Sequence, residues 1–218
     1  MKVTLQARVG LAVALVLVAF ASRDAAAGAP TEQFRHYADR ALEVLGAADL
    51  QKASATEERR AELRRTASDA FDFGEMTKRT LARHWQVRTP AEREEFIALF
   101  VSLLEHAYLG KIELYRGEKV SYVGESIDGD QATVRTRIVT KQGAEVPVDY
   151  RMHRRGDRWL VYDVAVEGIS LVGNYRTQFD RIIRRSSYTE LVAKLRSKEF
   201  PVPEAASAKG PSRDGQAR

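Results

Sequence analysis

Asp163 is the residue of this chain most suited to acid–base chemistry, because it follows Tyr162 inside the apolar stretch 159–166. A carboxyl group held in apolar surroundings can serve as a general base. The competing interpretation is structural, with Asp163 accepting hydrogen bonds from the backbone, Tyr175 or Arg176 at the corner that follows. Since no second polar side chain clearly converges on the same place, the structural interpretation is favoured and no catalytic residue is predicted.

Other reactive groups are few or badly spaced. The chain has four histidines and no cysteine, which excludes disulfides and thiolate metal sites. Metal-ligand spacing does not occur among the histidines, which are His36, His84, His106 and His153. The nucleophile-elbow, phosphate-loop and dinucleotide-binding motifs do not occur either. We therefore expect no metal, no organic cofactor and no enzymatic activity.

The first 27 residues have the pattern of a cleavable secretory signal peptide. Lys2 and Arg8 precede an apolar run over 9–21, and the small residues at 25–27 provide a cleavage site. The run is shorter than the ~20 residues of a membrane-spanning helix, and no cysteine follows it that could carry a lipid anchor. We predict export and a mildly basic mature chain, a charge that does not indicate a nucleic-acid partner.

Helical periodicity predicts four helices in the first half, over residues 32–52, 54–71, 75–85 and 91–115. Thr31 is expected to cap the first, Ser54 and Glu57 resemble a capping box for the second, and Thr89 with Pro90 marks the start of the fourth. The fourth helix carries two apolar stripes instead of one, namely Phe96, Phe100, Leu103 and Ala107 beside Ile97, Val101, Leu104 and Tyr108. Either two-sided packing or a hollow along one side explains this pattern.

From Lys119 onward the period changes to two, which predicts four antiparallel strands over 120–127, 132–140, 145–153 and 158–167. Alternation places Arg135 and Arg137 on a basic, solvated face of the sheet. The opposite face is apolar and carries Val134, Thr136, Ile138, Val146, Val148, Tyr150 and Met152. Two further helices are predicted over 171–185 and 189–198.

These elements predict an α+β fold with N-terminal helices, a four-stranded curved antiparallel sheet and C-terminal helices. A curved sheet that folds around the long helix forms a cone, which either fills with side chains or holds a ligand. We expect one domain over 31–200. The residues 201–218, rich in Ala, Ser, Gly and charge, are expected to form a disordered tail.

With these residues in place, the chain resembles the MlaC family of periplasmic phospholipid-binding proteins, the toluene-tolerance auxiliary components of ABC transport systems. The resemblance covers about residues 31–200. Its most specific part is the strand-to-helix corner, with Trp159, Tyr162, Asp163, Glu167, Gly168, Ile169, Ser170, Leu171, Asn174, Tyr175, Arg176, Gln178 and Phe179. A paralogous group that travels with hopanoid biosynthesis is similar throughout, so phospholipid and hopanoid both stay open as the lipid.

The resemblance implies an NTF2-like cone around an apolar cavity that holds the tails of a diacyl phospholipid and leaves the headgroup outside. It implies a periplasmic monomer that shuttles lipid between the outer and inner membranes and maintains outer-membrane lipid asymmetry. The implied partners are an outer-membrane lipoprotein–porin complex and an inner-membrane ABC transporter complex with its substrate-binding component. By position, Val146 and Ile169 match tail-contacting residues of the family, and facing extends the predicted lipid-binding set to Val148, Tyr150, Met152 and Leu171.

A lipid carrier needs such residues because burying a chain of ~16 carbons, at about 0.8 kcal/mol for each methylene, is worth roughly 12 kcal/mol. The container must therefore be as apolar as the bilayer interior. Candidates for contact with the headgroup or a partner are Arg151, Arg154, Arg155, Arg158 and Arg176. The rival function, an NTF2-like isomerase or hydrolase that uses Asp163, predicts a hollow too small for two lipid tails.

Overall fold

The computed structural model describes residues 29–115, 117–141, 143–198 and 200. The signal peptide predicted over 1–27 and the tail predicted over 201–218 lie outside these residues. None of the helices in the described part of the chain combines the length and the hydropathy that a membrane crossing requires.

Two helices, α1 (Ala29–Gly46) and α2 (Thr56–Ala70), pack against each other and are joined through the short 3-10 helix η2 (Ala53–Ala55). The capping predictions for both are wrong. Thr31 lies inside the first turn of α1, where Glu125 accepts hydrogen bonds from its backbone amide and its hydroxyl. Ser54 lies in η2, and no side chain caps α2. At the start of α1 the hydrogen-bond acceptor is therefore Glu125, from a strand distant in sequence, and not the expected cap residue Thr31.

The next helices are α3 (Phe73–Leu81), α4 (Arg83–Gln86) and α5 (Pro90–Leu104). The predicted start of α5 is confirmed, because Thr89 and Glu92 form a reciprocal capping box before Pro90. The predicted single helix over 91–115 is wrong in its second half. There the chain changes to a π-helical segment, Glu105–Leu109, and then to the short helix α6 (Gly110–Ile112).

The sheet is antiparallel, with strands in sequence order: β1 (Lys119–Asp128), β2 (Gln131–Val139), β3 (Glu145–Arg155), β4 (Arg158–Val166) and β5 (Ile169–Ser170). The first four match the predicted strands. The predicted count of four strands is one too low, because β5 has only two residues and is too short to show alternation. A tight turn, with Glu167 and Gly168 both at positive φ, folds β5 back against β4.

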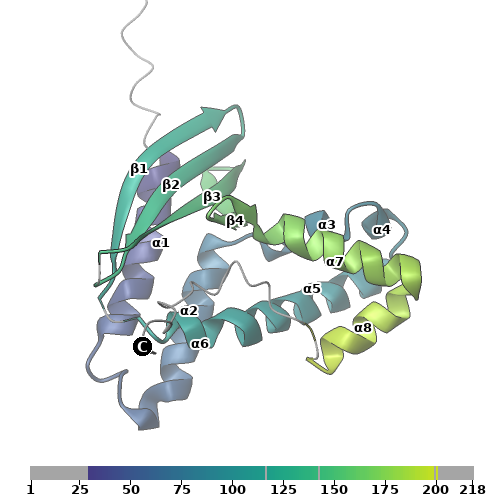
Figure 1. The fold of residues 1–218 in the computed structure, drawn as a ribbon, viewed down its shortest axis with the longest axis horizontal. Coiled ribbons are helices and arrows are strands. Elements are labelled where there is room, and N and C mark those ends of the chain that lie inside the picture. The colour runs from purple at the N-terminus through teal and green to yellow at the C-terminus, as the bar shows by residue number, and fades with distance from the viewer. Residues whose placement is uncertain (1–28, 116, 142, 199, 201–218) are drawn as a thin grey trace, which may run out of the picture.

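The chain ends in α7 (Leu171–Arg185) and α8 (Tyr188–Arg196), as the helical periodicity predicts. Figure 1 shows the sheet with α1 alongside it in one half of the molecule, and α3, α5, α7 and α8 in the other half. The α+β class is confirmed. The element order is also as expected, with helices before and after a curved sheet.

The buried apolar side chains fall into two clusters, whereas a domain of this size usually has one contiguous core. The helical cluster combines residues of α3, α5, α7 and α8 with Phe200. The sheet cluster consists of Phe34, Ala132, Val134, Met152, Trp159 and Val161. Among the described residues, Phe71 is the one side chain packed against both clusters. The two halves are therefore built around separate cores.

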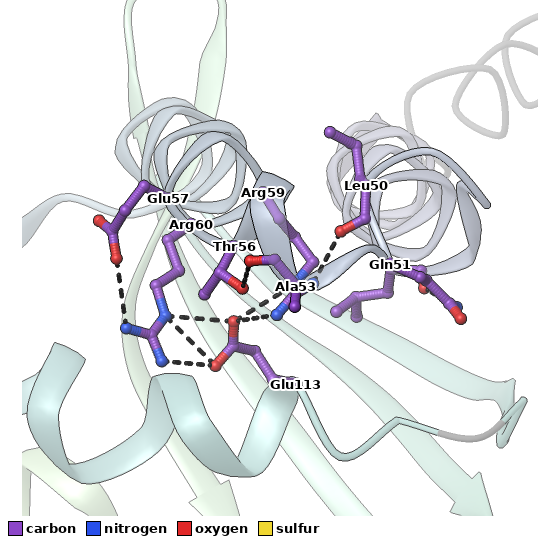
Figure 2. A network of polar contacts seen from close by, with 9 residues as sticks. Leu50, Gln51, Ala53, Thr56, Glu57, Arg59, Arg60 and Glu113 are labelled. Atoms are coloured by element: carbon purple, nitrogen blue, oxygen red, sulfur yellow. Dashed lines mark hydrogen bonds and ion pairs between the residues drawn. The ribbon is translucent and has the colours of Figure 1, made fainter.

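A polar clamp joins α2 to the chain just after α6 (Figure 2). The Glu113 carboxylate accepts hydrogen bonds from Arg59 Nη2 at 2.8 Å and Arg60 Nη2 at 3.0 Å. Arg59 also donates to the Leu50 carbonyl oxygen at 2.7 Å, which ties in the segment between α1 and α2. The hydrogen bonds from Arg60, together with those from Arg59, lower the pKa of Glu113, although its burial opposes the shift.

We predict that Glu113→Gln lowers the free energy of unfolding by about 2 kcal/mol at neutral pH, because charge-assisted hydrogen bonds to two guanidinium groups are lost. The folded-state pKa of Glu113 lies below its ordinary value of 4.5. Its stabilising contribution is therefore complete above that value and is lost as the pH falls through the folded-state pKa. Chemical denaturation of wild type and variant between pH 3 and pH 7 measures this.

The matched control is Glu105→Gln, which removes a carboxylate paired with Arg64 at a more exposed place. It is expected to change stability by less than about 1 kcal/mol. Equal losses for the two variants, or a Glu113→Gln effect that does not depend on pH, would contradict the role given to the clamp.

Candidate functional site

One face of the sheet is apolar apart from Glu125 of β1 and Thr136 of β2, and the strand register arranges its residues in four rows. The first row, nearest the β1–β2 turn, contains Ile127, Ala132, Met152 and Val161. The second contains Glu125, Val134, Tyr150 and Val164. The third contains Tyr122, Thr136, Val148, Val166 and Ile169, and the fourth contains Val120, Ile138 and Val146.

Helix α1 covers the first two rows. Phe34 of α1 belongs to the sheet cluster, and its ring centroid lies 3.9 Å from that of Tyr150. Met152 and Val134, the central residues of these rows, are both 0 % exposed. The centre of this end is therefore a filled core, while Ile127 at its β1 edge is 41 % exposed.

Coverage decreases along the strands towards the fourth row. Val148 in the third row is still 4 % exposed, but Ile169 at the edge of the same row is 50 % exposed. The three residues of the fourth row are all only partly buried, and none belongs to either cluster. The third and fourth rows thus form a strip of aliphatic side chains, in which Ile169 is half exposed and the others are buried or partly buried. The strip consists of Val120, Ile138, Val146, Val148, Val166 and Ile169.

The strip is apolar in its side chains, because the one polar residue at its centre has its hydroxyl bonded elsewhere. The Thr136 hydroxyl donates to the Val148 carbonyl oxygen at 2.9 Å, within the sheet. A hydrocarbon chain that covers this hydroxyl would leave its hydrogen bond intact. Burying the chain here therefore carries no penalty for an unpaired polar group.

The predicted lipid-binding residues divide between this strip and its surroundings. Val146 and Val148 lie on the strip, and Ile169 lies at its edge, in register with Val148 through Val166. Tyr150 and Met152 share the face but lie under α1, where Met152 is fully buried. Leu171 lies at the start of α7 and packs against the helical cluster. No contact with a lipid is visible for any of the six, and their assignment stays a prediction.

The predicted set of lipid-binding residues leaves out several members of the strip. Val120, Ile138 and Val166 occupy it as directly as Val146 does. The signal that could have found Val166 is strand pairing, since it lies opposite Val148 in the neighbouring strand. Alternation within single strands could not give this register, because bulges between Tyr122 and Gly124 and next to Arg151 shift it.

Two hollows open on the surface. One, of about 590 Å³, is lined by Ile169, Ser170, Gly173, Asn174, Thr177, Gln178 and Arg181, so it runs from the edge of the strip along α7. The other, of about 390 Å³, is lined by Asp72, Gly74, Glu75, Lys78, Trp85, His153 and Arg155. The first has the size of a ligand site and adjoins the strip at Ile169.

Asp163 is buried and structural. Its Oδ2 accepts hydrogen bonds from Ser170 Oγ at 2.6 Å and Arg151 Nη1 at 2.9 Å, and its Oδ1 accepts one from the Val172 backbone amide at 3.0 Å. Of the partners suggested by the sequence, the backbone is confirmed through the Val172 amide, whereas Tyr175 and Arg176 are wrong. Both carboxylate oxygens are occupied, and together they fix the start of α7 to β3 and β4.

The arginines proposed for headgroup contact already have protein partners. Arg151 binds Asp163, Arg154 binds Asp130 and Arg155 binds Asp72. Arg158 donates to the Asp69 carbonyl oxygen, and Arg176 donates to the Arg79 carbonyl oxygen at 2.9 Å. Within the described residues no cluster of three potential metal ligands occurs.

Comparison with known proteins decides the family. The family model described as MlaC protein matches residues 35–197, most of the chain. The chain belongs to the MlaC family. This confirms the family resemblance drawn from the strand-to-helix corner.

Relatives of this MlaC-family chain include lipid-transport proteins. The "Intermembrane phospholipid transport system binding protein MlaC" of Haemophilus influenzae is 23 % identical over 122 residues, which are 54 % of this chain and 57 % of the relative. The "Toluene tolerance protein ttg2D" of Pseudomonas putida is 27 % identical over 99 residues, 45 % of this chain and 46 % of the relative. The chain thus matches about half the length of these curated relatives.

A solved structure extends the likeness to the whole fold. The phospholipid-binding protein of Ralstonia solanacearum, in complex with a phospholipid, superimposes with a TM-score of 0.70 at 25 % identity. The match covers 78 % of this MlaC-family chain and 96 % of the Ralstonia protein.

We predict that Asp163→Ala lowers the free energy of unfolding by about 3 kcal/mol, because three hydrogen bonds to a buried carboxylate are lost at once. Thermal and chemical denaturation measure the effect. The control is Glu145→Ala, which removes a carboxylate whose partner Arg137 is as exposed as itself and which should cost under about 1 kcal/mol. An unchanged stability of Asp163→Ala would contradict the structural role and return Asp163 to consideration as a base.

Proposed function

We propose that this chain is a phospholipid carrier that holds lipid tails against the half-covered apolar strip of its sheet. The observation that carries the proposal is the partly buried fourth row of the face, formed by Val120, Ile138 and Val146, next to half-exposed Ile169 at the edge of the third row. The phospholipid-bound relative of the same fold supports it. The names of the curated relatives, which refer to phospholipid transport and toluene tolerance, agree with it.

Burial of apolar surface favours a lipid chain in the space beside the strip. Aliphatic side chains that stay partly exposed gain less from folding than fully buried ones, and a ligand that covers them removes both its own surface and theirs from water. At about 25 cal/mol for each Å² of apolar surface buried, a lipid chain along the strip gains several kcal/mol from the protein side alone. We infer that the strip is the wall of a site for a diacyl lipid, with its headgroup outside.

The proposed carrier moves lipid between the two membranes of the cell envelope. The chain carries phospholipid through the periplasm, between an outer-membrane lipoprotein–porin complex and an inner-membrane ABC transporter complex with its substrate-binding component, and so maintains outer-membrane lipid asymmetry. The pattern of a secretory signal peptide in residues 1–27 supports the periplasmic location. The proposed carrier is a monomer without a cofactor, with the lipid as its cargo.

We predict that Val146→Glu and Ile169→Glu each reduce lipid occupancy at least tenfold, because a carboxylate on the strip must be desolvated by the lipid tails. The measurement is native mass spectrometry of protein purified from a Gram-negative host, with the released lipid identified by its mass. A diacyl phospholipid is expected, and a hopanoid would instead identify the paralogous group.

The matched control is Ser121→Glu, which places the same charge on the opposite face of β1 and next to Val120 in sequence. Occupancy of this variant should equal that of wild type. Wild-type protein that folds but carries no lipid would overturn the proposed function. Full occupancy of both strip variants would show that the tails lie elsewhere.

A further inference from the structure

The hollow of about 590 Å³ joins the edge of the apolar strip to one face of α7, and we call it the α7 hollow. Its apolar end is Ile169, the half-exposed member of the strip. Its other end is Arg181, more than two turns into α7. Between them lie side chains three and four residues apart on the helix, which share one face, including Asn174 and Gln178.

The charge of the α7 hollow has one sign. Arg181 is its charged residue, and no carboxylate lines it. The smaller hollow differs, because Asp72 and Glu75 line it together with its cations. An anion in the α7 hollow therefore meets a positive charge and no fixed negative charge.

The guanidinium of Arg181 is available to a ligand. The side chain is exposed and forms no ion pair with any residue that the structure describes. Its neighbour Asp180 pairs with three other side chains, those of Arg83, His84 and Arg184. The arginines that the sequence suggested for the headgroup all have protein partners, so Arg181 is the better candidate.

An amide on the same face of α7 adds hydrogen-bond donors. Gln178 Nε2 donates to Asn174 Oδ1 at 2.6 Å, which orients the Asn174 amide and leaves both hydrogens of its nitrogen for another acceptor. Side chains of a helix lean towards its N-terminus, so the side chain of Arg181 extends back in the direction of Asn174. A group with several acceptor oxygens, placed between the two, can accept from both.

We propose that Arg181 and Asn174 bind the phosphate of the lipid headgroup in the α7 hollow. The inference rests on the proposed function and names the headgroup chemistry. In a glycerophospholipid the phosphate lies only a few bonds from the tails, so tails that reach Ile169 bring the phosphate into the α7 hollow. A phosphate has the oxygen geometry that a guanidinium binds with two parallel hydrogen bonds. The α7 hollow is open to water, so the headgroup stays outside the apolar strip.

The test measures competition between two lipids for the delipidated full-length protein. Vesicles contain equal amounts of phosphatidylglycerol and of diacylglycerol with identical chains, and native mass spectrometry gives the ratio of the two bound lipids. Diacylglycerol has the same tails but no phosphate. Relative to wild type, Arg181→Gln is expected to lower the ratio of phosphatidylglycerol to diacylglycerol about tenfold, the value of a charge-assisted hydrogen bond.

Two further variants keep the test independent of folding. Asn174→Asp retains the acceptor for Gln178 and places a carboxylate in the first turns of α7, where the helix dipole favours it. It should fold like wild type, and repulsion of the phosphate should also lower the ratio. The matched control is Arg185→Gln, which removes an exposed arginine of the same helix that does not line the α7 hollow. This variant should keep the wild-type ratio.

Calorimetric titration of inorganic phosphate into the delipidated protein separates a headgroup from a free anion. We expect no saturable binding, because one exposed guanidinium holds a small anion weakly when no lipid tails anchor it. Saturable binding that Arg181→Gln abolishes, with an unchanged lipid ratio, would identify a site for free phosphate and overturn the headgroup assignment. An unchanged ratio in Arg181→Gln without phosphate binding would also overturn it, while the carrier function would stand. Wild type that takes neither lipid would overturn the carrier function itself.

Discussion

The proposed function depends on one feature, which is that part of the apolar sheet face is only partly buried by the described side chains. Helix α1 fills the space over the first two rows, and nothing equivalent buries Val120, Ile138 and Val146 in the fourth. Ordinary cores are packed to the density of organic crystals. A face that is well packed at one end and only partly buried at the other is consistent with the proposed lipid site, and the Ralstonia relative of the same fold was solved with a phospholipid.

Buried or partly buried carboxylates join elements that are distant in sequence. Asp163 attaches α7 to the sheet, Glu113 attaches α2 to the end of α6, and Glu125 attaches the start of α1 to β1. Each of these carboxylates accepts several hydrogen bonds. None lies in the fourth row, where an ionised group would oppose burial of hydrocarbon.

Much of this architecture could be predicted from the sequence, and the failures have physical causes. Period-two alternation located the first four strands, and Thr89 with Pro90 located the start of α5, because these signals are local. The start of α1 was missed because its acceptor, Glu125, lies 94 residues away. The partners of Asp163 were missed because strand pairing, rather than sequence proximity, brings Arg151 to it.

The separation into two clusters has a further consequence for how such proteins diverge. Phe71 packs against both, and its neighbour Asp72 donates its backbone amide to the Val161 carbonyl oxygen at 2.9 Å. Substitutions on the strip, whose residues belong to neither cluster, can therefore change the wall of the proposed lipid site without costing either core its packing. Relatives with bulkier or slimmer cargo can arise by mutation of a few wall residues, while the residues that make each half fold remain untouched.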